Sequence, residues 1–181
     1  DDSMIDSLSV VIPAYNEAQN LPSCLQKVHS VLKTLKFDWE IIGVNDGSKD
    51  QTGEVAAAWA KKIPYLKVIT NHLNRGYGGS LKAGFSAASK EFVAVTHADN
   101  QLDFSEIDQL IKLQQESNAD IVSGIRAQGS DPLHRQFFRW GWNTLVRALF
   151  GYLSSDIDCG FILFRRNILD RVNLPSDGAM L

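Results

Sequence analysis

Short apolar runs alternate along the chain with segments that repeat apolar residues at helical spacing, and this alternation constrains the fold most. The run from Phe92 to Val95 is apolar at consecutive positions, which is typical of a strand covered on both faces. The expected strands are residues 8–12, 39–44, 66–70, 92–96, 119–124 and 161–164, and the expected helices are residues 21–35, 54–61, 79–89, 107–113 and 133–150. This order predicts an α/β fold with a mostly parallel sheet and helices on both faces.

Length and composition fit one globular domain, which we expect to span residues 1–181. Hydrophobic residues make up 44% of the chain and charged residues 22%, with no repeat or low-complexity tract. The formal net charge of −3 gives no support to nucleic acid as a partner. Cys24 and Cys159 match neither a disulfide framework nor a zinc spacing, so we expect buried, reduced thiols. We expect no signal peptide, and no stretch approaches the ~20 apolar residues of a membrane span.

Polar residues gather just after the first four expected strands. They form segments 13–17, 45–50, 71–79 and 97–101, which are rich in acids, amides and glycine. The carboxyl ends of parallel strands share one edge of the sheet, and open α/β sheets bind ligands there. We therefore expect one site built from all four loops. In any single loop, however, the same residue types also serve ordinary turns and helix caps.

The fourth of these loops carries candidate metal ligands. If the loop is extended, successive side chains point to opposite sides, so His97, Asp99 and Gln101 share one side. An imidazole, a carboxylate and an amide oxygen form a small ligand set for a divalent cation that carries phosphates. The alternative is a turn in which Asp99 and Asn100 only cap the following helix.

The glycine-rich segment 76–81 does not indicate a nicotinamide cofactor. Leu81 stands where a dinucleotide fingerprint has its third glycine, and the segment follows the third expected strand. The phosphate-loop pattern also fails, because Phe85 and not lysine follows Gly84. A helix that starts here would still offer free amides to an anion.

Several blocks of sequence resemble the family 2 glycosyltransferases, which have the GT-A fold. The first four blocks are VVIPAYNEAQNL, NDGSKDQT, NRGYGGSLKAGF and HADNQLDFSEI. Two later blocks resemble the polyprenyl-phosphate branch, akin to dolichol-phosphate mannosyltransferase, and they are SGIRAQGSDPLHRQFFRWGWNTLVRALFG and DIDCGFILFRR. The resemblance covers nearly the whole chain and implies a Rossmann-like three-layer sandwich. It also implies inverting transfer of a hexose from a UDP- or GDP-sugar to a dolichyl or undecaprenyl phosphate.

The resemblance further implies roles for individual residues. Asp99 matches the second acid of the family's Asp-x-Asp metal motif, and His97 and Gln101 match positions beside the metal, which would be Mn²⁺ or Mg²⁺. The positions that match donor-binding residues are Pro13, Tyr15, Glu17, Asp46, Gly76, Lys82, Ala98 and Asp99, the first four of them at the nucleobase and ribose. The expected catalytic residues are Asp99, Arg126, Arg135 and Asp158, and the two arginines match family arginines near the donor and acceptor phosphates.

Two positions depart from the family pattern. His97 and Asn45 stand where the family usually has aspartate, which lowers the negative charge available to a cation. A neutral imidazole suits Mn²⁺ better than Mg²⁺, and His97 is equally suited to reach a phosphate directly without any metal. A catalytically silent module that only binds a nucleotide sugar is therefore an alternative.

The segment 133–152 bears on the acceptor. On a helical projection it shows an apolar face, a stripe of arginines and a second apolar side. This pattern fits a helix at a membrane interface, or a helix buried on two sides. A lipid phosphate is already ionised near neutral pH, whereas a saccharide hydroxyl needs a carboxylate base, for which Asp156 and Asp158 are candidates.

We expect a lipid-phosphate acceptor at the cytoplasmic face of a membrane, with transfer to a saccharide hydroxyl as the alternative. Members of the family continue beyond the point that corresponds to residue 181, so we expect the chain to be truncated at its C-terminus.

Overall fold

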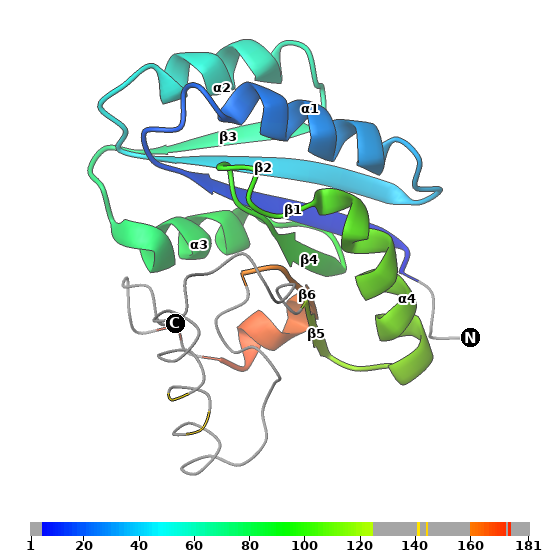
Figure 1. Ribbon diagram of the computed structural model, residues 1–181. Coiled ribbons are helices and arrows are strands. Elements are labelled where there is room, and N and C mark those ends of the chain that lie inside the picture. The colour runs from blue at the N-terminus through cyan, green and yellow to red at the C-terminus, as the bar shows by residue number, and fades with distance from the viewer. Residues whose placement is uncertain (1–4, 125–140, 142–143, 145–159, 173, 175–181) are drawn as a thin grey trace.

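The apolar runs become the strands of one six-stranded sheet (Figure 1). The computed structural model describes residues 5–124, 141, 144, 160–172 and 174. The strands are β1 (Ser7–Ala14), β2 (Asp38–Asp46), β3 (Leu66–Asn71), β4 (Phe92–Val95), β5 (Ile121–Ser123) and β6 (Ile162–Arg165). Their order across the sheet is β3-β2-β1-β4-β6-β5, which confirms the expected α/β fold.

The first four strands are parallel, and β1 lies at their centre. β1 pairs with β2 on one side and with β4 on the other, while β2 also pairs with β3. The loops that follow β1, β2 and β4 therefore leave the sheet at one edge. β6 lies between β4 and β5 and is antiparallel to both. The sheet is thus mostly parallel, as expected, with a reversed strand inserted near one side.

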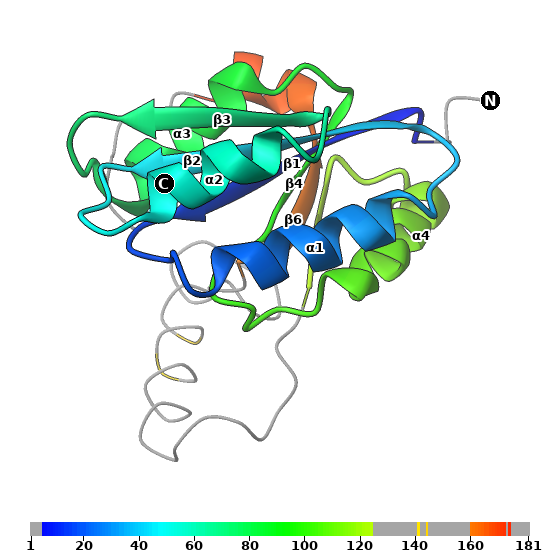
Figure 2. The same cartoon turned by 90° about the horizontal axis from the view of Figure 1, so that it is seen from above.

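Helices cover both faces of the sheet, as Figures 1 and 2 show. The α-helices are α1 (Leu21–Leu32), α2 (Thr52–Ala60), α3 (Gly76–Ala87) and α4 (Ile107–Ser117), and the 3₁₀ helices are η1 (Phe104–Glu106) and η2 (Arg166–Asp170). One buried cluster joins α1, α2 and α4 to Val10 and Ile12 of β1, and a second joins α3 and η2 to Val11. Because successive side chains of a strand point to opposite faces, β1 contributes to both clusters.

Helix α3 begins at Gly76, three residues before the start expected from its apolar pattern. Its glycines permit a close approach to the sheet: a Cβ added at Gly84 would lie 2.3 Å from Val11 Cγ1. The helix backbone therefore packs directly on β1. Of the expected helix 133–150, only Gly141 and Thr144 are described, and both are helical; the rest lies outside the described residues.

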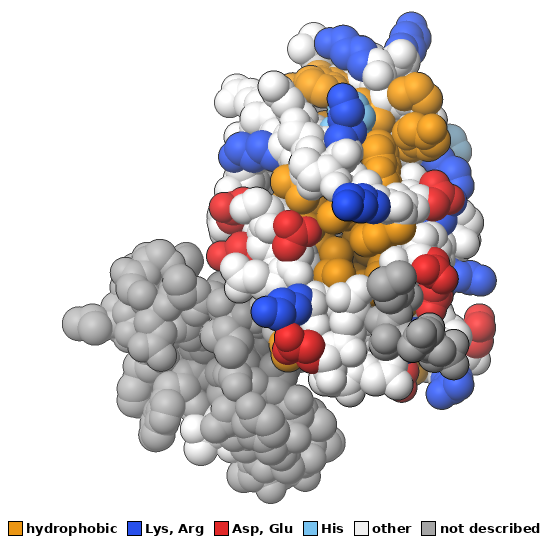
Figure 3. Space-filling view, turned by 90° about the vertical axis from the view of Figure 1, so that its right-hand side faces the viewer, with side chains coloured by type: hydrophobic (Ala, Val, Ile, Leu, Met, Phe, Trp, Pro, Cys, Tyr) orange, Lys and Arg blue, Asp and Glu red, His pale blue; other side chains and the backbone are white. Residues whose placement is uncertain are grey.

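A buried carboxylate stabilises the opposite edge of the sheet, where the strands begin. Glu40 Oε1 accepts hydrogen bonds from Ser9 Oγ at 2.7 Å and from the Ser89 N–H and hydroxyl at 2.7 and 2.8 Å. Glu40 Oε2 lies 2.6 Å from Lys67 Nζ. Burial by itself raises the pKa of Glu40, but the hydrogen bonds from Lys67, Ser89 and Ser9 outweigh it and lower the pKa to about 2. Figure 3 shows the right-hand side of the molecule as drawn in Figure 1, where charged side chains border a band of hydrophobic ones.

We predict that Glu40 makes stability depend on acid pH. Its pKa falls from an ordinary 4.5 to about 2 on folding, so its contribution is present above pH 4.5 and is lost as pH falls toward 2. Glu40→Gln is expected to lower the free energy of unfolding at pH 7 by about 2–4 kcal/mol. Urea denaturation at several pH values measures both effects.

The matched control is Glu54→Gln, because Glu54 is exposed on α2. It is expected to change the free energy of unfolding by less than about 0.5 kcal/mol. Equal pH dependence in wild type and Glu40→Gln would contradict the role assigned to Glu40.

Candidate active site

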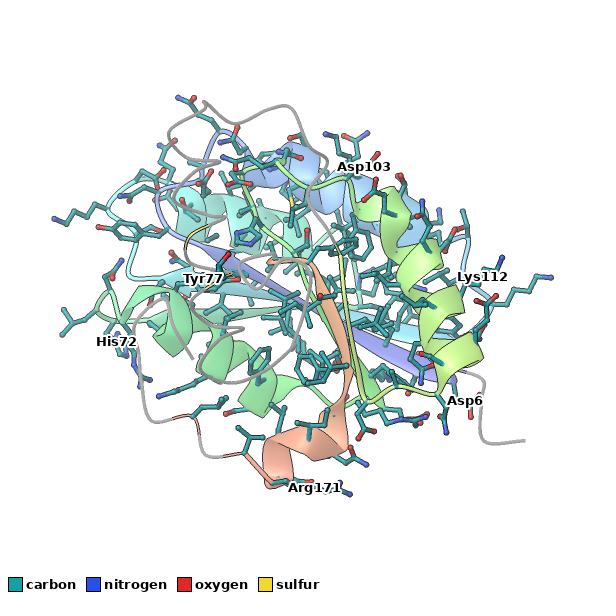
Figure 4. The ribbon with its side chains drawn as sticks, turned by 60° about the horizontal axis from the view of Figure 1, so that its bottom comes forward. Asp6, His72, Tyr77, Asp103, Lys112 and Arg171 are labelled. Carbon is teal, nitrogen blue, oxygen red and sulfur yellow. The ribbon has the colours of Figure 1, made fainter. Side chains whose placement is uncertain are left out.

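A pocket of about 310 Å³ lies at the carboxyl ends of β1, β2 and β4, beside the N-terminal end of α3. Figure 4 shows Tyr77 at this end of α3. The described residues that line the pocket are Pro13, Ala14, Tyr15, Glu17, Asp46, Asn74, Gly76, Tyr77, Ser80, His97, Ala98 and Asp99. Segments from all four predicted loops therefore meet in one place, as the polar clusters after the strands indicate.

The loop after β1 is fixed by hydrogen bonds to the loop after β2. Asn16 has a left-handed backbone with φ of 57°; its N–H donates to Ser48 Oγ at 3.0 Å and its side-chain oxygen accepts from the Lys49 N–H at 2.8 Å. The next residue, Glu17, donates its N–H to Thr52 Oγ1 at 2.8 Å. These bonds satisfy loop backbone groups that have no strand partner. They hold Tyr15 and Glu17 at the mouth of the pocket.

Asp46 anchors the loop between β3 and α3. Its Oδ1 accepts from Asn71 Nδ2 at 2.7 Å, and the Arg75 N–H lies 3.0 and 3.1 Å from its two carboxylate oxygens. The following residue, Gly47, has a φ of +64° and packs so tightly that an added Cβ would lie 2.6 Å from Asn74 N. The side chain of Asp46 is almost completely buried, yet it borders the pocket. It therefore holds the loop that shapes the pocket as well as lining it.

The loop after β4 turns where an extended segment was expected. Asn100 has a φ of 59°, and Asp99 Oδ1 accepts the Gln101 N–H at 3.0 Å, which closes a turn. Gln101 is exposed and lines a separate groove beside α1 together with Lys27 and Asp103. The prediction that His97, Asp99 and Gln101 share one side is therefore wrong for Gln101. Within the described part of the chain, no group of three or more His, Cys, Asp or Glu side chains is placed to hold a metal.

Most predicted donor residues do meet in the pocket. They are Pro13, Tyr15, Glu17, Asp46, Gly76, Ala98 and Asp99, and the metal candidate His97 joins them. Lys82 is not among the lining residues, because it lies six positions after Gly76 and so on another face of α3. The predicted residues Arg126, Arg135 and Asp158, together with Asp156 and Cys159, lie outside the described residues.

Sequence reasoning missed four lining residues: Ala14, Asn74, Tyr77 and Ser80. Tyr77 and Ser80 lie one and four positions after Gly76, so a helix that begins at Gly76 would have indicated both.

Asn45 faces away from the pocket, into the layer beneath α1 and α2. It lines an internal cavity with Leu25 and Ala56, and a Cβ added at Gly53 would lie 2.8 Å from its Nδ2. Neighbouring strand residues alternate in direction, so Asp46 borders the pocket and Asn45 does not. The effect of Asn45 on the charge available to a cation stays a prediction.

The described lining of the pocket is acidic. It contains the carboxylates of Glu17, Asp46 and Asp99 and no lysine or arginine. Beneath it, Cys24 donates from Sγ to the His97 carbonyl at 3.4 Å. Burial, with the nearby charge of Asp99, raises the pKa of this thiol to about 12, so it stays protonated and is not a nucleophile at neutral pH.

The comparisons with known proteins agree with this architecture. Residues 9–172 match the sequence profile described as "Glycosyl transferase family 2". The chain belongs to this family. It is 38% identical over 172 residues to a dolichyl-phosphate beta-glucosyltransferase of Trichomonas vaginalis, covering 88% of this chain and 53% of the relative. It is 34% identical over 168 residues to an undecaprenyl-phosphate 4-deoxy-4-formamido-L-arabinose transferase of Serratia proteamaculans, covering 92% and 51%. The chain thus spans about half the length of these relatives.

Solved structures of this glycosyltransferase fold are also similar. A mannosyltransferase from Pyrobaculum calidifontis in complex with GDP-Man and Mn²⁺ has a TM-score of 0.69 at 20% identity, covering 96% of this chain and 47% of that one. A mannosyl-3-phosphoglycerate synthase from Rubrobacter xylanophilus has a TM-score of 0.73 at 17% identity, covering 90% and 54%. At these identities the likeness establishes the GT-A fold.

We predict that Asp46→Ala both destabilises the protein and weakens nucleotide binding. It leaves the Arg75 N–H and the Asn71 amide without their acceptor, which is expected to cost about 1–3 kcal/mol of unfolding free energy. Affinity for UDP or GDP, measured by calorimetry, is expected to fall at least about tenfold, since a carboxylate that lines the pocket is lost.

Asn71→Ala serves as the control, because it removes one hydrogen bond to Asp46 but no lining residue of the pocket. It is expected to lower stability by about 0.5–1.5 kcal/mol and to leave the nucleotide affinity within about twofold. If Asp46→Ala bound nucleotide as well as Asn71→Ala does, Asp46 would be only an anchor for the loop.

Proposed function

We propose that this protein transfers a hexose from a UDP- or GDP-sugar to a polyprenyl phosphate, with inversion at the anomeric carbon. The observation that supports this most is the acidic pocket at the carboxyl ends of β1, β2 and β4 in a member of glycosyl transferase family 2. The names of two relatives, a dolichyl-phosphate glucosyltransferase and an undecaprenyl-phosphate sugar transferase, favour a lipid-phosphate acceptor.

In this proposal the nucleoside occupies the end of the pocket formed by the loops after β1 and β2. Pro13 and Tyr15 offer apolar and aromatic surface to a base, and Tyr15 is 42% exposed. Glu17 and Asp46 offer carboxylate oxygens, which accept hydrogen bonds from base N–H and ribose O–H groups. The N-terminal end of α3 borders the same pocket, and its positive dipole end favours the diphosphate that follows the ribose.

A divalent cation fits the proposed donor site. A diphosphate beside three carboxylates needs a positive partner, and no described lining residue supplies one. Asp99 is the residue that would hold the ion, with oxygen atoms of the diphosphate as further ligands. When bound, such an ion stabilises the negative charge that develops on the departing nucleoside diphosphate. The Mn²⁺ in the mannosyltransferase of similar fold supports the same proposal.

The acceptor side of the proposal rests on residues outside the described part of the chain. We propose that Arg126 and Arg135 bind the phosphates and that Asp158 positions these arginines, because an ionised lipid phosphate attacks without a base. Contact with the cytoplasmic face of a membrane through residues 133–152 belongs to the same proposal. Among the residues that the structure describes, no helix has the length and apolar character needed to cross a bilayer.

We predict that Asp99→Ala abolishes metal-dependent donor binding. Calorimetric titration with UDP-glucose and GDP-mannose, each with and without Mn²⁺, identifies the donor of the wild-type protein. In Asp99→Ala the affinity gained from Mn²⁺ is expected to disappear, and transfer activity is expected to fall about 10²–10³-fold. Failure of the wild type to bind either nucleotide sugar, with binding of NADH instead, would contradict the proposal.

Asp103→Ala is the matched control on the same loop. Asp103 caps η1 through the Ser105 N–H at 3.0 Å, and it lies well apart from Tyr77 (Figure 4). Loss of this cap is expected to cost about 0.5–2 kcal/mol of stability while the response to Mn²⁺ is retained.

We also predict that transfer requires a lipid phosphate and no dedicated base. With the identified donor, radiolabelled sugar is expected to pass to dolichyl or undecaprenyl phosphate and not to a free saccharide. Asp158→Asn is expected to keep a measurable single-turnover rate, because the phosphate acceptor has no proton to lose. Transfer to a saccharide hydroxyl, with complete loss of the chemical step in Asp158→Asn, would favour a polysaccharide-type enzyme.

A further inference from the structure

Two stacked rings stand at the β4 end of the pocket. The Tyr77 ring of α3 and the His97 ring of the β4 loop are 5.5 Å apart between centroids and only 7° from parallel, and Tyr77 Oη lies 3.5 Å from His97 Nε2. Both residues line the pocket next to Asp99. The stack therefore joins the start of α3 to the loop that carries the proposed metal ligand.

The backbone just before β6 closes the other side of the imidazole. A Cβ added at Gly160 would lie 2.0 Å from His97 Nε2, and 3.0 and 3.1 Å from the two ring carbons that flank this nitrogen. Near-equal distances of this size place the point in front of Nε2 and in the ring plane, because a point above the ring would lie nearer to the carbons. This is the direction of the nitrogen lone pair.

A metal ion bound to Nε2 would need this same position. Metal–imidazole bonds are about 2.0–2.1 Å long, so the ion would lie where a Cβ of Gly160 would be, one bond length from its Cα. That separation is far shorter than any contact between an ion and a carbon atom. With Gly160 in place, the Nε2 side of His97 cannot coordinate a metal.

We propose that His97 is a positioning residue and that its Nε2 does not bind a metal. With Tyr77 on its face and Gly160 at its edge, the imidazole packs against both segments and holds the loop that carries Asp99. This inference rests on the proposed function for the identity of the metal and the nucleotide. The packing of the His97 ring against Gly160 does not depend on either ligand.

The contact between the His97 ring and Gly160 is tested without any ligand, by thermal unfolding of four proteins. They are the wild type, Gly160→Ala, His97→Ala and the double variant. In the presence of His97 the added methyl group collides with the ring, so Gly160→Ala is expected to lower Tm by several degrees. In the His97→Ala background the same change is expected to lower Tm by less than half as much. If Gly160→Ala lowered Tm equally in the two backgrounds, the His97 ring would not pack against Gly160.

The absence of coordination is tested by Mn²⁺ and Mg²⁺ titration with saturating UDP or GDP, whichever binds. His97→Ala is expected to weaken Mn²⁺ and Mg²⁺ by the same factor and to leave their ratio unchanged, because it loosens the Asp99 loop without removing a ligand. Asp99→Ala, which removes a ligand, is expected to weaken both at least tenfold and more than His97→Ala does. An imidazole ligand favours Mn²⁺ over Mg²⁺, so selective loss of Mn²⁺ affinity in His97→Ala would overturn the proposal. His97→Asp is expected to tighten Mn²⁺ at least fivefold, because it adds a carboxylate next to Asp99.

The two experiments separate the inference from the proposed function. If neither nucleotide binds the wild type, the proposed function fails, and the thermal comparison still decides whether His97 is seated on Gly160. If nucleotide and metal bind but His97→Ala behaves like Asp99→Ala, the proposed function stands and the role of His97 as a positioning residue is wrong.

Discussion

The parallel pairing of β1 with both β2 and β4 is the constraint on which the rest of the molecule depends. It places three chain reversals at one edge of the sheet, where backbone N–H and C=O groups lose their strand partners. The loops supply the missing partners to one another, through Asn16 and Ser48, Glu17 and Thr52, and Asp46 and Arg75. The pocket is therefore enclosed by segments that already need one another for stability.

Much of this arrangement can be predicted from the sequence, because burial and side-chain pattern determine it directly. Continuous apolar runs such as Phe92–Val95 become strands buried on both faces, and the polar residues after them reach the same edge. The helical period of α1 places Leu21, Leu25 and Leu32 in the core. Membership in glycosyl transferase family 2 then indicates a class of reaction for the pocket, which the residue pattern alone does not.

The remaining features depend on local backbone geometry and on contacts distant in sequence. The left-handed conformation of Asn100 turns the β4 loop and separates Gln101 from Asp99, and no periodicity predicts a single positive φ. Asn45 and Asp46 are adjacent polar residues at the end of β2. The position of β2 in the sheet decides which of the two side chains borders the pocket. The reversed direction of β6 and the position of Gly160 against His97 follow from the chain's return to the sheet after a long connection.

Glu40 lies at the opposite end of the strands from the pocket. Its buried network secures the strand starts, whereas the pocket occupies the strand ends. Substitutions in the pocket loops leave the hydrogen bonds of Glu40 in place, and substitutions around Glu40 leave the pocket lining in place. The lining of the pocket and the acid stability of the fold can therefore change independently, because each is determined at its own end of the same sheet.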